Sequence, residues 1–483
     1  MTQPGPAEQG PAPVPSSDGR ESPTWPRTQA PPEPPRPRRR PGWWPLRIAT
    51  VVVVVLALIG GAISVWGHGG RQSSPAAPAT AASGASTTTT TVATTSQAVP
   101  AGIRVVESDV ERLRGLRFRR PVPVTVESPS KVAAQLLREL DSDTDKADVR
   151  RQGRALALLG EVPASTDLYQ LLRSVQAESV LGFYVPGKPP AKGRLYVRSD
   201  HGLDPFTRFV LSHELTHAVT DQHYDLTLAD RLESANASDR AAAYSGLLEG
   251  DATVTMQRYF ERVLSPDEQA TAAQVAASQS TAKMDAAPAA VREYLEFPYS
   301  AGAAFVNALY RRGGWDAVNR AYRDPPTSTE QLLHPERYLD RRDQPQTLHV
   351  PDLHAALGSG WRQGTHTEWG EFDARVLLES AFPVTTAERA AAGWDGGELR
   401  TFERGKRTAM VLRTVWDSPG EAGENCTAMS RWATVRFGSP TASDRWSTPV
   451  QQGALLCQGA HVAWLSAPDS ASLDRLVRGL GSP

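Results

Sequence analysis

The residues best suited to chemistry lie in one run, LSHELTHAVTDQH, at positions 211–223. His213 and His217 are four positions apart, so on a helix their imidazoles lie one turn apart on the same face. Both imidazoles can then reach one Zn²⁺ ion at about 2.0–2.1 Å. Glu214 follows the first histidine and could accept a proton from a water molecule that the metal activates. The run therefore predicts a catalytic zinc site with Glu214 as its general base.

A catalytic zinc site needs a third protein ligand and keeps one position open. His223 has the spacing of HExxHxxGxxH sites, but Thr220 stands where that arrangement requires a glycine to turn the chain. Glu249 lies among apolar residues of a predicted helix at about 239–264. A carboxylate in an apolar helix face is costly unless it is paired or binds a metal. We therefore favour Glu249 over His223 as the third zinc ligand.

A zinc hydrolase also needs a hydrogen-bond donor for the negative charge that develops on the substrate oxygen. His334 and Tyr338, in LLHPERY, could supply it, and so could Tyr299, in FPYSAG. We take His334 forward as the further catalytic candidate, although a structural role would explain each of the three residues as well.

Two aspartates lie close in sequence to the predicted ligands. Asp221 is one helical turn after His217 and could orient a ligand histidine, although capping or a surface ion pair would explain it equally well. Asp251 is two positions from Glu249 and should point to the opposite face of its helix. Asp251 is therefore a weak metal candidate.

Helices and a hairpin are expected to position these residues. From residue 128 onward, apolar residues recur at helical spacing. Strands are then predicted at 180–185 and 194–198, joined by a turn that is rich in proline and glycine. A long helix at about 204–223 should carry both histidines, and the helix at 239–264 should carry Glu249.

The motifs resemble those of known zinc peptidases. HELTHAVTD, at 213–221, resembles the zinc helix of thermolysin-type peptidases, and EGDA, at 249–252, resembles the third-ligand helix of the wider gluzincin group. By this likeness the two histidines and Glu249 are metal ligands, and Glu214 is the general base. Thr253 stands where the thermolysin-type helix carries an aspartate, and the interval to Glu249 is longer than in that family.

Over about residues 178–400 the chain is similar to uncharacterised, membrane-anchored bacterial metallopeptidase-like proteins. These combine a HExxH helix with DQHxDL, LEGDA and PPxSTEQLLHPExY segments, which here lie at 221–226, 248–252 and 325–338. In gluzincins an edge strand above the metal pairs with an extended substrate. The resemblance makes 194–198 the candidate edge strand, and a simple role in the sheet is equally compatible with its sequence.

Three segments of unusual composition precede the catalytic region. Residues 1–46 are rich in proline and arginine and are expected to be a disordered cytoplasmic tail. Residues 48–66 carry no charge over 19 positions, enough to cross a hydrocarbon layer of about 30 Å, so a transmembrane helix is predicted at 47–67. The arginines before it place the N-terminus in the cytoplasm. A cleaved signal peptide would have a shorter apolar core. Residues 68–100, rich in Ser, Thr and Ala, should form a linker.

The rest of the chain is expected to have an α+β fold in two parts. Residues 101–395 should form a mainly helical catalytic domain with a small β-hairpin or sheet, of the zincin type that the resemblance implies. Residues 396–483 should form a small α+β module without a functional motif. Cys426 and Cys457 lie in this module, and outside the cell a disulfide is favoured over two buried thiols.

Charge and composition narrow the function. The chain has 52 Lys+Arg and 53 Asp+Glu, which argues against a nucleic-acid binder. The predicted function is that of a membrane-anchored, extracytoplasmic zinc metallopeptidase of the bacterial envelope, with a peptide or protein substrate. The alternative is a catalytically inactive envelope scaffold or binding protein that retains the zinc helix. Glu214 separates the two hypotheses, because a scaffold has no use for a carboxylate beside an open metal position.

Overall fold

The structure is a computed structural model, and it describes residues 95–187, 193–199 and 202–483. All of these residues fall within one compact unit. The predicted cytoplasmic tail 1–46, the predicted transmembrane helix 47–67 and the linker as far as residue 94 lie outside the described residues. Within the described part of the chain, no helix is both long enough and apolar enough to cross a membrane.

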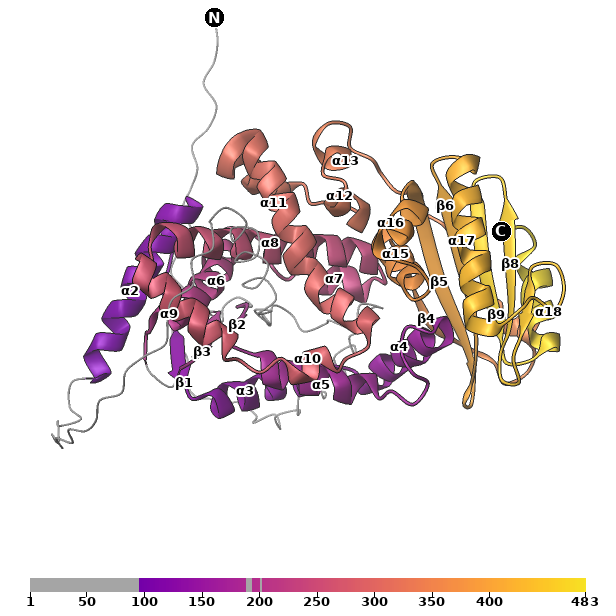
Figure 1. The fold of residues 1–483 in the computed structure, drawn as a ribbon, viewed down its shortest axis with the longest axis horizontal. Helices are drawn as coiled ribbons and strands as arrows, with labels where there is room; N and C mark the ends of the chain where they lie inside the picture. Colours follow the sequence, from indigo (N-terminus) through magenta and orange to yellow (C-terminus); the bar gives the residue numbers. More distant parts are fainter. Residues whose placement is uncertain (1–94, 188–192, 200–201) are drawn as a thin grey trace, which may run out of the picture. The chain divides into compact units, whose positions relative to one another are not determined.

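The fold is α+β, and most of the chain before residue 392 is helical (Figure 1). Its helices are α2 (Thr95–Arg114), α3 (Pro129–Asp143), α4 (Lys146–Leu159), α5 (Leu168–Ser179), α6 (Pro205–Asp221), α7 (Leu228–Ser234), α8 (Ser238–Arg262), α9 (Pro266–Ala277), α10 (Ala282–Asp285), α11 (Ala289–Arg323), α12 (Thr329–Leu333), α13 (Glu336–Leu339), α14 (His354–Leu357), α15 (Glu371–Glu379) and α16 (Val384–Ala391). Helix α8 packs extensively against both α11 and α6, and these three helices form the frame of the site.

Helix α6 forms where the sequence predicts it. Asp204 caps its N-terminus by accepting a hydrogen bond from the backbone N–H of Thr207, and Pro205 occupies the first turn, where its missing N–H costs no hydrogen bond. The helix ends at Asp221, short of the predicted end at residue 223. Nearly all of its residues are buried, so α6 runs through the core and carries both histidines into it.

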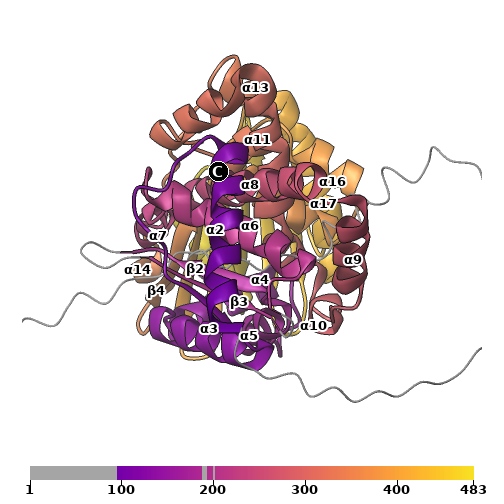
Figure 2. The same ribbon diagram turned by 90° about the vertical axis from the view of Figure 1, so that its left-hand side faces the viewer.

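Helix α2 begins at Thr95, inside the segment that the composition predicts to be a linker up to residue 100. Ile103, Val106 and Val110 recur at helical spacing and are buried. The helix packs against α6 and α8 (Figure 2, where α2 faces the viewer). The folded part of the chain therefore begins earlier than the sequence indicates.

A three-stranded sheet lies beside α6. Its strands are β1 (Val124–Glu127), β2 (Gly182–Val185) and β3 (Arg194–Arg198), in the order β1-β3-β2. The predicted hairpin is confirmed, because β2 and β3 pair in antiparallel fashion. The prediction that Arg194–Arg198 is an edge strand is wrong: β3 is central, because β1 pairs with its other side in parallel. Its backbone groups are used on both sides, so β3 cannot add a substrate strand.

The C-terminal part contains a six-stranded antiparallel sheet. In sheet order its strands are β4 (Arg362–Glu368), β5 (Trp394–Arg404), β6 (Arg407–Trp416), β9 (His461–Ala467), β8 (Gln452–Gln458) and β7 (Arg445–Ser447). One face packs against α17 (Pro419–Phe437) through a cluster of tryptophans, and the other packs against α14 and α18 (Ser470–Leu480). Strand β4 precedes the predicted module boundary at residue 396 and still belongs to this sheet. Its sequence, RQGTHTE, lacks the apolar alternation that identifies a strand.

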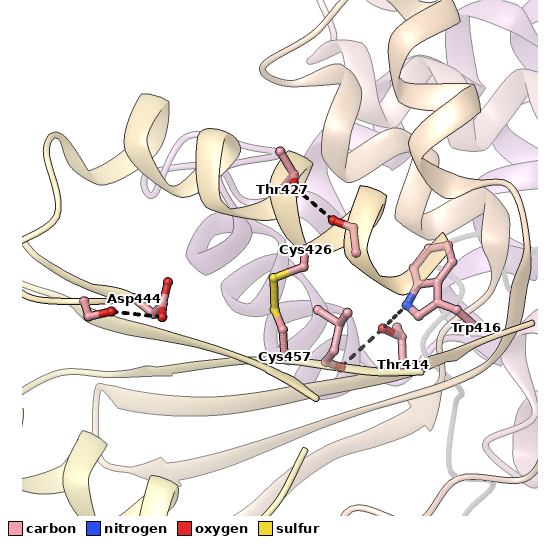
Figure 3. The surroundings of a disulfide bond; sticks show 9 residues. Thr414, Trp416, Cys426, Thr427, Asp444 and Cys457 are labelled. Carbon is pink, nitrogen blue, oxygen red and sulfur yellow. Dashed lines mark hydrogen bonds between the residues drawn. A yellow bond between two sulfur atoms is a disulfide. The ribbon is translucent and has the colours of Figure 1, made fainter. Parts of the chain in front are cut away.

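Cys426 and Cys457 form a disulfide, as expected, with their Cα atoms 6.3 Å apart. The bond joins α17 to β8 (Figure 3). The α17 face of the sheet shares one continuous hydrophobic core with the helices of the preceding region. The C-terminal sheet is therefore packed against the helical part rather than joined to it by a free linker.

Candidate metal centre

Two imidazoles meet inside the protein on one face of α6. The ring centroids of His213 and His217 are 4.8 Å apart, and their Nε2 atoms are 3.1 Å apart. Both side chains are almost completely buried. Burial lowers the pKa of His213 to about 4, so its imidazole is neutral at pH 7 and able to coordinate a cation.

Glu249 reaches the same point from α8. Its Oε2 atom lies 3.3 Å from the Nε2 atom of His213 and 3.3 Å from that of His217. Burial alone would raise the pKa of Glu249, but the two imidazoles outweigh burial and lower it to about 2. The carboxylate is therefore ionised at neutral pH.

The three donor atoms fit a zinc ion. Donors that bind one zinc ion in tetrahedral geometry at about 2.0–2.1 Å are about 3.3–3.4 Å apart. The separations between the three donors are 3.1–3.3 Å. Two imidazoles and one carboxylate are also a typical protein donor set for catalytic zinc, which keeps a fourth position open. The structure thus brings the three residues predicted as ligands together as one group that could hold a metal.

Glu214, the predicted general base, is completely buried beside this group. Neither carboxylate oxygen has a hydrogen-bonding partner of good geometry among the described residues. Burial raises the pKa of Glu214 well above its usual value, the negative charge of Glu249 adds to the increase, and the backbone of Tyr184 acts in the opposite direction. A completely buried carboxylate with a strongly raised pKa is costly, which is typical of a functional residue.

Strand β2 runs directly past Glu214. A Cβ atom on Gly182 would stand 3.2 Å from Cγ of Glu214, so the glycine leaves room for the carboxylate. This role of β2 was not predicted from the sequence. The signal was nevertheless present, because a glycine inside a strand often marks a close approach of another group to the backbone.

Three glycines hold α8 close to α11 on either side of Glu249. A Cβ atom on Gly250 would stand 2.2 Å from the carbonyl carbon of Gly302, and one on Gly302 would stand 2.1 Å from the carbonyl oxygen of Gly246. No real Cβ atom tolerates such distances, so the two helix backbones touch only because these side chains are absent. Gly250, which follows Glu249 in LEGDA, therefore has a packing role: it sets how closely α8 approaches α11.

Asp251 lies on another face of α8, as the sequence predicts. One of its carboxylate oxygens is 2.6 Å from Nε of Arg114, and the other accepts a hydrogen bond from the hydroxyl of Tyr322. Both charged side chains are fully buried. Arg114 also stacks over the ring of Trp315. This ion pair ties α2 and α11 to the helix that carries Glu249, and it leaves Asp251 outside the metal group.

Asp221 and His223, at the end of α6 and just beyond it, form hydrogen bonds with other parts of the chain. Asp221 accepts a hydrogen bond of 2.7 Å from the hydroxyl of Tyr184, and no bond joins it to a ligand histidine within the described part of the chain. The Nε2 atom of His223 lies 2.8 Å from the carbonyl oxygen of Arg117. His223 is therefore not part of the donor group, and Glu249 occupies the third position.

His334 lies with other partners. Its Nε2 atom is 2.9 Å from the carboxylate of Glu371, and its Nδ1 atom is 3.9 Å from that of Glu336. The hydrogen bond with Glu371 raises the pKa of His334. The hydroxyl of Tyr338 donates to a backbone carbonyl oxygen. Both side chains therefore bond to groups outside the metal group among the residues that the structure describes.

Tyr299 is the oxyanion candidate that lies next to a ligand. It projects from α11, its side chain is buried, and its ring centroid is 6.2 Å from that of His213. The structure therefore favours Tyr299 over His334 as the candidate hydrogen-bond donor to the substrate oxygen.

One comparison with known proteins concerns the C-terminal sheet. A family model described as "Domain of unknown function (DUF8575)" matches residues 359–477, which begin just before β4 and end in α18 and do not include the metal group. No curated protein matches the chain. A solved structure from Chloroflexus aurantiacus, described as a candidate hydrolase with a novel fold, is 20% identical and covers 50% of this chain and 89% of its own. Its TM-score is 0.31, which supports no conclusion about a shared fold or activity.

Proposed function

We propose that this chain is a zinc metallopeptidase of gluzincin type that hydrolyses peptide bonds with Glu214 as general base. The observation that carries the proposal is the convergence of His213, His217 and Glu249 at separations that suit one zinc ion. The completely buried carboxylate of Glu214, beside the metal group, favours an enzyme over an inactive scaffold. A scaffold would gain nothing from a carboxylate that destabilises the fold.

The ligand side chains and Glu214 divide the chemistry between them. His213, His217 and Glu249 would hold the zinc ion, which when bound supplies a Lewis acid for the scissile carbonyl. Glu214 accepts a proton from the attacking water and then returns it to the leaving amine. Tyr299 is the candidate donor to the oxyanion, because it lies beside a ligand.

The free edge of β2 is the proposed site for an extended substrate. The backbone N–H of Arg198 donates to the carbonyl oxygen of Leu181, so by the alternation of an antiparallel ladder Gly182 and Tyr184 direct their backbone groups away from β3. Among the described strands, none pairs with this edge. A peptide added here would lie beside Glu214, which contacts the same strand.

The proposal includes a place outside the cytoplasm, with the predicted helix 47–67 as membrane anchor. The disulfide between Cys426 and Cys457 supports this, because disulfides persist mainly in oxidising compartments. The balanced charge supplies no basic footprint for nucleic acid. The proposed partners are therefore a peptide or protein substrate and the membrane.

The test combines metal analysis of the full chain with digestion of a peptide library, with and without chelator. Glu214→Gln should keep zinc and reduce turnover by about 10²–10⁴-fold, the usual contribution of a general base. Glu249→Ala should lose zinc from this site, whereas His223→Ala, the matched control, should keep both zinc and activity. Turnover that persists in Glu214→Gln would contradict the mechanism. A zinc-loaded wild type that cleaves no member of the library would favour the scaffold.

A further inference from the structure

The opposite edge of the small sheet is also free. Strand β1 pairs with β3 on one side only, and within the described part of the chain no strand covers its other side. Leu195 N–H donates to the carbonyl oxygen of Pro123, and Ser199 N–H donates to that of Glu127. By the alternation of a parallel ladder, Thr125 also faces β3, whereas Val124 and Val126 direct their N–H and C=O groups outward.

No proline occupies the outward-facing positions of β1, Val124 and Val126. Proteins often place a proline or a charged side chain at outward positions to prevent strand addition. Pro121 and Pro123 precede β1, but they stand at positions that alternate with Val122 and Val124. The outward donors of the valines are therefore intact, and the edge can receive an extended backbone.

An open groove lies beside this strand. Its volume is about 690 Å³, and it runs between α2 and the segment that leads into β1. The side chains of Ile103, Phe118 and the three valines at positions 122, 124 and 126 form its apolar lining. These valines are half-buried, whereas the residue before each of them, at 121, 123 and 125, is exposed. The groove therefore has an apolar surface with the same two-residue period as an extended peptide.

The charged groups of the groove are mostly basic. Arg104, Arg119 and Arg120 line it, against a single carboxylate, Glu107. Arg104 and Arg120 are exposed at the surface, and Arg119 donates to the backbone carbonyl of Gln222. A ligand that carries negative charge along one side would match this set.

We propose that this groove, formed by α2 and the free edge of β1, binds an extended acidic peptide segment of a partner protein by strand addition. The backbone of the segment pairs with Val124 and Val126, and its apolar side chains face the lining. Its carboxylates face Arg104, Arg119 and Arg120. The groove lies on the edge of the sheet opposite β2, so it is separate from the proposed substrate edge, and binding here does not require zinc.

Fluorescence anisotropy of the full chain tests this with a labelled octapeptide of alternating Glu and Val, in the presence of chelator so that nothing is hydrolysed. The Glu/Val peptide should bind, the matching Lys/Val peptide should bind at least tenfold more weakly, and the affinity should fall with added salt. Two N-methylated forms of the Glu/Val peptide, one methylated at the odd and one at the even backbone nitrogens, should also differ. The form that loses the N–H groups facing the edge should bind more weakly, because it loses hydrogen bonds to β1.

Two variants localise the binding. Arg104→Glu with Arg120→Glu should weaken binding of the Glu/Val peptide at least tenfold, whereas Arg478→Glu, an exposed control on α18, should leave it unchanged. Val124→Pro removes one outward N–H and should weaken binding without charge reversal. Equal binding of the acidic and basic peptides, or wild-type affinity in the double variant, would overturn the proposal. So would capture by anionic phospholipid vesicles without any binding of the peptide, since that outcome assigns the groove to a lipid surface.

Discussion

The contact between α8 and α11 makes a sharp prediction about the metal centre. In Gly302→Ala, the new Cβ atom would stand 2.1 Å from the carbonyl oxygen of Gly246. A carbon and an oxygen atom in van der Waals contact are more than about 3 Å apart, so the two helices must separate by about 1 Å. Overpacking of this kind costs about 1–3 kcal/mol of unfolding free energy.

The same displacement should disturb zinc binding. Helix α8 also packs against α6, and Glu249 bridges the two helices at 3.3 Å from each histidine. A shift of about 1 Å either compresses these contacts or stretches them beyond about 4.2 Å, the widest spacing that two donors on one zinc ion allow. We therefore expect Gly302→Ala to lower zinc affinity at least tenfold.

The assay is urea denaturation with and without zinc, together with competition against a chromogenic chelator. Under the proposed function, zinc should stabilise the wild type in proportion to the logarithm of its concentration over Kd, so weaker binding appears as a smaller zinc-dependent shift. Gly423→Ala is the matched control, because Gly423 is also helical and a Cβ atom added there would have nothing within 4 Å. That variant should bind zinc normally and gain about 0.5–1 kcal/mol.

Two results would refute this reasoning. If Gly302→Ala unfolds at the same urea concentration as the wild type and binds zinc equally well, the helices have room that the structure does not show. If stability falls but zinc affinity is unchanged, the contact stabilises the helix pair without positioning Glu249. Gly246→Ala should be milder, because its Cβ atom would meet the flexible end of Leu332.

Three further predictions concern stability. Burial raises the pKa of Asp373 to about 7, so the folded state keeps a proton that the unfolded state releases; this stabilisation is complete below about pH 4 and is lost as the pH rises through about 7. Across this range, urea denaturation should show that the unfolding free energy falls by roughly 2–4 kcal/mol because of Asp373. In Asp373→Asn, the dependence of the unfolding free energy on pH should decrease by the equivalent of about one bound proton. Arg114→Met leaves Asp251 buried without its cation and should cost about 3–5 kcal/mol, measured by the same method, whereas replacing both partners with apolar residues should cost much less. Reduction of the disulfide at Cys426 opens a loop that spans 31 positions and should lower the unfolding free energy by about 3–4 kcal/mol, with a double alanine variant insensitive to reductant.

The metal group is the part of the site that the sequence predicts best. Helical periodicity alone places His213 and His217 on one face, and α6 confirms the helix. The choice of Glu249 over His223 depended on the cost of a carboxylate in an apolar helix face, and the 3.3 Å contacts agree with it. These inferences succeed because each depends on local geometry or on burial, which the chain pattern reveals directly.

The order of strands could not be predicted in the same way. The hairpin of β2 and β3 is local, but β1 lies far before it in the sequence and joins by parallel pairing. A strand as short as β1 leaves little trace of periodicity, and its partner is chosen by tertiary packing. Because β1 occupies one side of β3, the proposed substrate-binding edge is that of β2 and not of β3. In β2, Gly182 leaves space for Glu214.

Glycines inside helices and strands were a further signal in the sequence, and hydrophobic periodicity does not include it. Gly182 lies inside a strand, and Gly250 lies inside a helix directly after a ligand, so both stand where glycine lowers intrinsic stability. The cost of a glycine inside a helix or strand must be offset by a close contact that a larger side chain would prevent. Here Gly182 contacts the proposed base and Gly250 contacts Gly302 beside the third ligand. A glycine within an element and next to a candidate catalytic residue therefore predicts that another backbone or reactive group approaches at that point.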